Sequence, residues 1–297
     1  MNAEEGRFAG AGGVAIYCQS WLPEIEPRAA VVIVHGAGEH SGRYPHVAAR
    51  LVADGYAVHA LDHRGHGHSG GSRALIDRMD NAVADVDSLV LRVIARHPGT
   101  PVFMLGHSMG GTVALCYTMR HQDRLAGLIL SAPLAALEAA SPTMRLTGKL
   151  LSAVAPRRGL IAVDSALVSR DPEVVRAYES DPLVHHGKLP ARTVAELALA
   201  VESFPDGVGA IQLPTLILYG TADRLCPPSG SVMVGDRIGS DDVTVRAFDG
   251  LYHEILNEPE QGAVLDALCS WLYERVGSAG AGGTAGTAPM SSRHPLR

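Results

Sequence analysis

Residues 101–117 read PVFMLGHSMGGTVALCY. The apolar first part predicts a strand, the glycine-rich centre predicts a tight turn, and residues 111–117 have the pattern of a helix. Gly106 and Gly110 flank Ser108 at a distance of two residues, so the backbone can turn sharply there and hold the serine hydroxyl exposed above a sheet edge. This arrangement predicts that Ser108 is a nucleophile.

Short apolar runs alternate with segments of helical pattern along the chain. The runs are residues 31–34, 58–61, 101–105, 127–130, 215–219 and 243–248. Their alternation predicts a mostly parallel sheet with helices on both faces. Residues 6–9 and 14–22, joined by a glycine-rich link, predict an opening antiparallel hairpin. We therefore expect an α/β fold with eight strands.

The regular spacing breaks once, where about eighty residues replace a single crossover helix. This predicts a core of residues 1–133 and 213–276 with an inserted helical cap, residues 134–212. Helical patterns lie at 144–154 and 193–203 within the cap. Residues 277–297 are rich in Gly, Ala, Ser, Thr and Pro, which predicts a flexible tail.

Composition excludes several classes of protein. Of the 297 residues, 46% are hydrophobic and 19% charged, as in a globular protein with a large core. The net charge of −6 and the scattered basic residues argue against nucleic-acid binding. The four cysteines form no CxxC pair, so we expect free thiols. The start lacks the pattern of a signal peptide and no apolar run is long enough to span a bilayer, which predicts a cytoplasmic or peripheral membrane location.

A second match to the GxSxG pattern centres on Ser69. The preceding apolar run ends at Leu61, and the residues after Ser69 are Gly-Gly-Ser rather than the start of a helix. Because the strand and helix context is missing, we expect Ser69 to be a loop residue and Ser108 to be the nucleophile.

The serine needs a base and an acid that orients the base. His253 follows the last apolar run, and Asp223 follows the run before it. The order Ser108, Asp223, His253 is that of the catalytic triad in α/β-hydrolases, so the expected fold is an α/β-hydrolase. Weaker candidates for the acid are Asp241, Asp242 and Asp249.

Two backbone N–H groups must face the oxyanion that develops during acyl transfer. One is that of Met109, after the serine, and the other is that of Ala37, in the loop after the run 31–34. The histidines of residues 62–68 invite a metal interpretation, but they lie in an irregular loop without an obvious carboxylate or cysteine partner. We expect no metal and no cofactor.

Several longer motifs resemble the monoacylglycerol lipase family. They are HGAGEHSGRY at 35–44, DHRGHG at 62–67, GHSMGG at 106–111, YESDP at 178–182, ADRLC at 222–226 and YHE at 252–254. The resemblance implies hydrolysis of monoacylglycerols to fatty acid and glycerol, under a cap that docks on lipid surfaces.

The same resemblance implies that Glu39, Arg43 and Tyr178 bind the glycerol hydroxyls. Vertebrate members of the family have a histidine three positions after the catalytic one, where this chain has Leu256, so one glycerol contact differs. Cys226 matches a cysteine near the site of that family.

Two other functions fit the same residues. A lysophospholipase or general carboxylesterase would share every catalytic residue, and a non-catalytic lipid-binding protein with this fold would be expected to lack one of them. Cap contact with membranes or micelles would use an apolar stripe at near-helical spacing, made of Met144, Leu146, Leu150, Leu151 and Val154.

Overall fold

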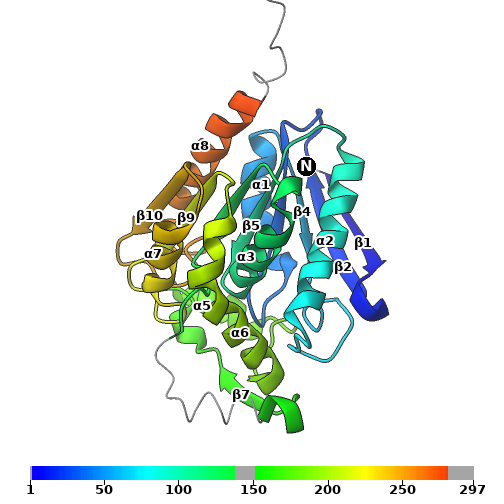
Figure 1. The fold of residues 1–297 in the computed structure, drawn as a ribbon, viewed down its shortest axis with the longest axis vertical. Coiled ribbons are helices and arrows are strands. Elements are labelled where there is room, and N and C mark those ends of the chain that lie inside the picture. The colour runs from blue at the N-terminus through cyan, green and yellow to red at the C-terminus, as the bar shows by residue number, and fades with distance from the viewer. Residues whose placement is uncertain (1, 138–150, 280–297) are drawn as a thin grey trace, which may run out of the picture.

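The computed structural model describes residues 2–137 and 151–279, which are built around one eight-stranded sheet (Figure 1). The strands are β1 (Asn2–Ala9), β2 (Ala15–Leu22), β3 (Ala29–Val34), β4 (Tyr56–Leu61), β5 (Val102–His107), β6 (Gly127–Ser131), β9 (Thr215–Gly220) and β10 (Val243–Phe248). Their order across the sheet is β1-β2-β4-β3-β5-β6-β9-β10. Strands β1 and β2 pair antiparallel to each other, β2 pairs antiparallel to β4, and all other pairs are parallel. The expected α/β-hydrolase fold is confirmed.

Helices cover both faces of the sheet. Helices α1 (Pro45–Ala53) and α8 (Gln261–Ala279) pack on one face, and α2 (Met79–Arg96), α3 (Met109–His121) and α7 (Pro228–Arg237) pack on the other. In β3, Val32 and Val34 point into the core below α3, whereas Val31 and Ile33 point into the core below α1. Both sides of the central strands are therefore fully buried, which explains their unbroken apolar sequence.

The opening hairpin is longer than the apolar pattern predicts. Strand β1 starts at Asn2, because residues 2–5 continue the ladder with β2 up to the pair Asn2 and Leu22. These residues are exposed at the edge of the sheet and include two glutamates. An edge strand facing solvent needs no apolar side chains, so hydropathy does not reveal it.

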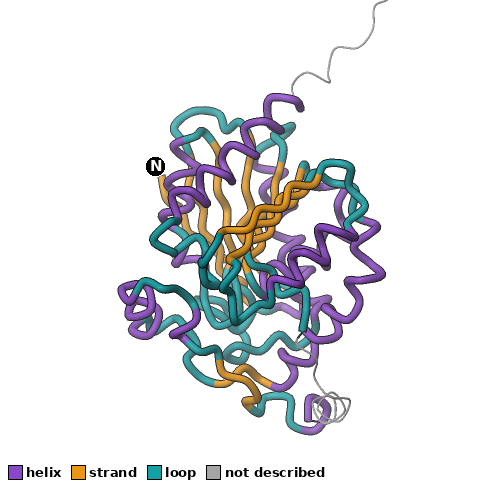
Figure 2. Tube along the Cα trace, turned by 90° about the vertical axis from the view of Figure 1, so that its left-hand side faces the viewer, coloured by secondary structure: helices purple, strands orange, loops and turns teal. Residues whose placement is uncertain are grey.

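The described part of the segment between β6 and β9 adds further helices and a second sheet, and its residues Leu197, Val201 and Phe204 belong to the same apolar core cluster as α3. It contains α5 (Pro172–Ser180), α6 (Ala191–Gly207) and a small antiparallel sheet of β7 (Gly159–Ala162) and β8 (Lys188–Pro190). Figures 1 and 2 show these elements gathered at the end of the molecule opposite the last turn of α8. Helix α6 contains the expected helix at 193–203, but the two short strands have no clear sequence signal.

Parts of two expected elements lie outside the described residues. Of the expected helix at 144–154, residues 151–154 are helical and residues 144–150 are not described. Helix α8 continues to Ala279, and residues 280–297 of the expected tail are not described. Every helix in the described part of the chain is too short or too polar to cross a membrane.

Candidate active site

Ser108 occupies a sharp turn between β5 and α3. Its backbone has φ of +54° and ψ of −122°, a conformation that residues other than glycine rarely adopt. Hydrogen bonds hold this turn: the Ser108 N–H donates to Ser131 O at 3.1 Å, and Gly111 N–H donates to Ser108 O at 2.9 Å. Such strain persists only where the surroundings enforce it, and it is common at functional sites.

The two flanking glycines leave room for that turn. A side chain at Gly110 would collide with the carbonyl oxygens of Val34 and His35, because α3 starts directly against the end of β3. A side chain at Gly106 would lie 2.6 Å from Gly110 O. The GxSxG spacing therefore reflects close contact between the first turn of α3 and the sheet.

Asp223 and His253 lie together at the ends of β9 and β10. The Asp223 Oδ2 atom is 2.8 Å from His253 Nδ1, and both residues are buried. Asp223 Oδ1 accepts hydrogen bonds from the N–H groups of Leu225 at 2.8 Å and Cys226 at 2.9 Å. The carboxylate is thus fixed by the backbone on one side and orients the imidazole on the other.

The environment of His253 favours the protonated imidazole. Burial by itself lowers the pKa of His253, but the charge of Asp223 and its hydrogen bond to the ring outweigh this and raise the pKa above its usual range. The ring of His107 lies 4.8 Å from that of His253. Burial lowers the pKa of His107, so this neighbour stays neutral.

The Ser108 hydroxyl contacts a thiol in this structure. The Ser108 Oγ atom is 3.7 Å from Cys226 Sγ. Among the described residues, this hydroxyl forms no hydrogen bond with His253. Proton transfer from Ser108 to His253 would need a rearrangement that brings the two side chains within hydrogen-bond distance. Catalytic hydrogen bonds are often formed only once substrate is bound.

The alternative residues have other partners. Ser69 Oγ accepts from Tyr17 N–H at 2.8 Å and donates to Asp62 O at 2.6 Å, so its hydroxyl ties its own loop to β2 and to the end of β4. Asp249 accepts from the Thr221 hydroxyl. Asp242 pairs with an arginine of α8 and Asp241 is exposed.

The loop after β3 presents Ala37 to the same site. Glu39 Oε1 accepts from Gly36 N–H at 2.5 Å, and His35 Nδ1 lies 2.8 Å from Gly36 O. His35 Nε2 accepts from a backbone N–H at 2.9 Å, so Nδ1 is the nitrogen that donates to Gly36 O. The N–H groups of Ala37 and Met109 have no hydrogen-bond acceptor among the described residues, and both residues line the cavity beside Ser108.

A buried charged cluster lies next to His253. Arg43 Nη1 donates to Glu254 Oε1 at 2.6 Å and to Glu39 Oε2 at 3.0 Å, and its Nη2 donates to Glu254 Oε2 at 2.8 Å. The guanidinium carbon is 4.8 Å from the centre of the Tyr178 ring. Burial by itself raises the pKa of Glu39. The charge of Arg43 and the hydrogen-bond donors outweigh this and bring the pKa below its usual value, so the carboxylate is charged.

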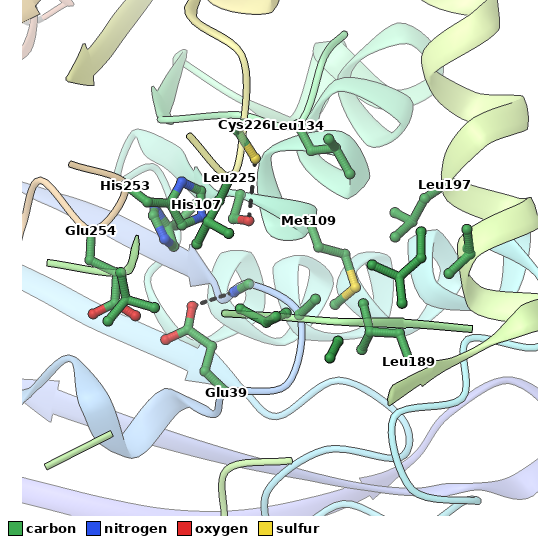
Figure 3. A pocket seen from close by; sticks show the side chains of 18 of the residues that line it. Glu39, His107, Met109, Leu134, Leu189, Leu197, Leu225, Cys226, His253 and Glu254 are labelled. Carbon is green, nitrogen blue, oxygen red and sulfur yellow. Dashed lines mark hydrogen bonds between the residues drawn. The ribbon is translucent and has the colours of Figure 1, made fainter. Parts of the chain in front are cut away.

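These groups meet in a cavity of about 240 Å³ (Figure 3). Ser108, His253, Glu39, Glu254 and Tyr178 line it, whereas Arg43 lies behind the two glutamates. In Figure 3, Leu189 and Leu197 lie at the end of the cavity away from His253 and Glu254. Their apolar character and the carboxylates at the opposite end suit a molecule with one polar and one apolar end.

One residue of this cluster is not predicted from the sequence. The family resemblance implies Glu39 and Arg43 but not Glu254, which forms the shortest hydrogen bond with Arg43. Glu254 directly follows the predicted base, so its position in the chain was the available signal. A pairing across 211 residues cannot be read from one sequence.

Comparisons with known proteins identify the family of this chain. The family model described as "Serine aminopeptidase, S33" matches residues 25–260. The chain is 45% identical over 273 residues to the monoacylglycerol lipase of Mycolicibacterium smegmatis, covering 92% of this chain and 98% of the relative. It is 37% identical to the monoglyceride lipase of Mus musculus, covering 92% and 91%. The chain belongs to the monoacylglycerol lipase family.

A solved structure of this family has the same fold. The monoacylglycerol lipase of Paleococcus ferrophilus superimposes with a TM-score of 0.78 at 32% identity, covering 93% of this chain and all of that one. This chain is therefore an ester hydrolase with the α/β-hydrolase fold.

The contact between Asp223 and His253 predicts the pH dependence of activity. In the wild type, kcat/KM should fall as the pH drops through the raised pKa of His253, because the protonated imidazole cannot accept the serine proton. Asp223→Asn removes the charge that raises this pKa, so the acidic limb should move to lower pH and the maximal rate should fall about 10⁴-fold. The measurement is a pH profile of kcat/KM on a soluble ester.

Asp249→Asn is the matched control, since Asp249 also follows a core strand but contacts Thr221. It should leave the profile unchanged. A pH profile of kcat/KM that changes in Asp249→Asn and not in Asp223→Asn would contradict the assignment of Asp223 as the acid that orients His253.

Proposed function

We propose that this enzyme hydrolyses monoacylglycerols to fatty acid and glycerol, with Ser108 as nucleophile, His253 as general base and Asp223 as the acid that orients it. The observation that carries the proposal is the cavity, which joins the Ser108 turn to buried carboxylates at one end and leucines at the other. The names of the relatives support the same substrate class.

The first half of the reaction forms an acyl-enzyme. His253 Nε2 takes the Ser108 proton as Oγ attacks the ester carbonyl. The N–H groups of Ala37 and Met109 then donate to the oxyanion, and each such donor contributes about 3 kcal/mol. The tetrahedral intermediate collapses, the bond to the glycerol oxygen breaks, and His253 protonates the leaving alcohol.

The second half releases the fatty acid. His253 takes a proton from water as the water oxygen attacks the acyl carbonyl. The second tetrahedral intermediate collapses, the bond to Ser108 Oγ breaks to release the fatty acid, and His253 returns the proton to Oγ. Asp223 stabilises the imidazolium in both halves, which accounts for its short contact with Nδ1.

The polar end of the cavity suits the glycerol hydroxyls. The Tyr178 hydroxyl makes no hydrogen bond with a described residue, and burial raises the pKa of Tyr178, so it stays a neutral donor and acceptor. Glu39 supplies acceptor oxygens at the same end. Arg43 acts here by holding these groups, since its two terminal nitrogens are bound to Glu39 and Glu254.

In this proposal the described residues of the segment 134–212 form the cap over the acyl chain. Leu189, Val194 and Leu197 from this segment line the cavity. Two hydrogen bonds tie the segment to the loop after β3: His40 Nε2 lies 2.9 Å from Asp181 Oδ2, and His185 N–H donates to Gly38 O at 2.7 Å.

Initial rates on mono-, di- and triacylglycerols and a lysophospholipid test the proposed substrate. The wild type should prefer the monoacylglycerol at least about tenfold, and Ser108→Ala should lose at least about 10⁴-fold of the activity. Equal or better turnover of the other esters would contradict the proposed glycerol-binding roles of Glu39 and Tyr178. Undiminished activity of Ser108→Ala would contradict the assignment of Ser108 as the nucleophile.

The cap also carries exposed apolar side chains, and we propose that they contact a lipid surface at a peripheral membrane location. Val154 is 71% exposed and Ile161 is 51% exposed, and Ile161 also lines the cavity. Of the apolar stripe expected from the sequence, Met144, Leu146 and Leu150 lie outside the described residues. Exposed apolar side chains such as these favour contact with lipid.

Adsorption to a lipid monolayer tests this contact. The double variant Val154→Gln and Ile161→Gln should adsorb more weakly than the wild type, because it loses apolar area. Leu91→Gln is the control, since Leu91 is 46% exposed on α2, far from the cap in sequence and not part of the cavity. Unchanged adsorption of the double variant, or an equal loss in the control, would contradict the proposal.

A further inference from the structure

When His253 is neutral, as a general base must be, the charged side chains among the described lining residues are carboxylates at one end of the cavity. Glu39 and Glu254 are lining residues, and none of the described lining residues is a lysine or an arginine. Figure 3 shows both glutamates on the side of the cavity that holds His253. The alcohol part of an ester bound at Ser108 therefore meets carboxylates and no exposed cation.

Arg43 balances only one of these two charges. Its Nη1 and Nη2 atoms make three hydrogen bonds to the carboxylates, and its side chain is 10% exposed behind them. One guanidinium and two carboxylates leave the cluster with one net negative charge. Glu39 and Glu254 side chains are each 5% exposed, so solvent and salt screen this charge poorly.

Of the two glutamates, Glu254 is the one whose side chain does not hold the Ala37 loop. Glu39 also holds the Ala37 loop through Gly36 N–H and accepts from the Tyr44 hydroxyl. Glu254 binds Arg43 and the Asn257 amide, and its own N–H is bound to Val168 O. Changing the charge of Glu254 thus leaves the contacts of the Ala37 loop in place.

We propose that Glu254 selects the headgroup of the substrate, so that the enzyme accepts esters of uncharged alcohols rich in hydroxyl groups and rejects esters whose alcohol carries a phosphate. This inference rests on the proposed function. A hydroxyl donates to the carboxylates, whereas a phosphate would lie beside a net negative charge without a free cation to pair with. Discrimination here arises from repulsion of the wrong ligand as well as attraction of the right one.

The direct test compares two substrates with the same acyl chain. These are 1-dodecanoylglycerol and its 3-phosphate, presented at equal mole fraction in the same neutral micelles. Glu254→Gln keeps the size of the side chain and removes one negative charge, so the kcat/KM ratio of phosphate ester to neutral ester should rise at least about tenfold. Glu254→Asp keeps the charge and should retain the wild-type ratio.

Glu260→Gln is the matched control, because Glu260 is a half-exposed glutamate that pairs with Arg170 and does not line the cavity. Its ratio should equal that of the wild type. An unchanged ratio in Glu254→Gln, or an equal rise in Glu260→Gln, would overturn the assignment to Glu254.

A second measurement uses the unaltered protein and does not depend on the folding of a variant. The non-hydrolysable ether 1-O-dodecylglycerol and its 3-phosphate compete with 4-nitrophenyl butyrate as the reporter substrate. The phosphate should inhibit at least about tenfold more weakly than the neutral ether, and equal inhibition would overturn the inference.

The two proposals fail in different ways. Poor turnover of 1-dodecanoylglycerol relative to other uncharged esters would count against the proposed function and leave the phosphate comparison intact. Efficient turnover of 1-dodecanoylglycerol, with no selection against the phosphate in either measurement, would overturn the headgroup role alone.

Discussion

The close contact between the first turn of α3 and the end of β3 is the constraint on which the site depends. It requires glycine at Gly110, and it places the positive-φ backbone of Ser108 where the hydroxyl faces the cavity. A strained residue of this kind costs about 1–3 kcal/mol, which the hydrogen bonds to Ser131 and Gly111 offset. The sheet therefore holds Ser108, the proposed nucleophile, in place before any substrate binds.

One loop after β10 serves two buried electrostatic systems. His253 contacts Asp223, and the next residue, Glu254, contacts Arg43. In the proposed mechanism, the first system sets the proton affinity of His253, and the second sets the charge that faces the alcohol part of the substrate. Because consecutive residues serve both, chemistry and headgroup selection are coupled through the position of a single short segment.

The sequence was most informative where local rules govern structure. The strand, turn and helix around Ser108, and the order of Asp223 and His253 after it, follow from hydropathy and glycine spacing. The edge strand at residues 2–5 was missed because solvent-facing edges need no apolar side chains. Glu254 was missed because its partner Arg43 lies 211 residues away, and the short strands β7 and β8 are four and three residues long.

Labelling with a fluorophosphonate, followed by peptide mass spectrometry, identifies the nucleophilic serine. The reagent phosphonylates an activated serine, and we expect a single adduct on the peptide that contains Ser108, with labelling greatly slowed in Asp223→Asn. An adduct on Ser69, or labelling that survives in Ser108→Ala at the wild-type rate, would contradict this expectation.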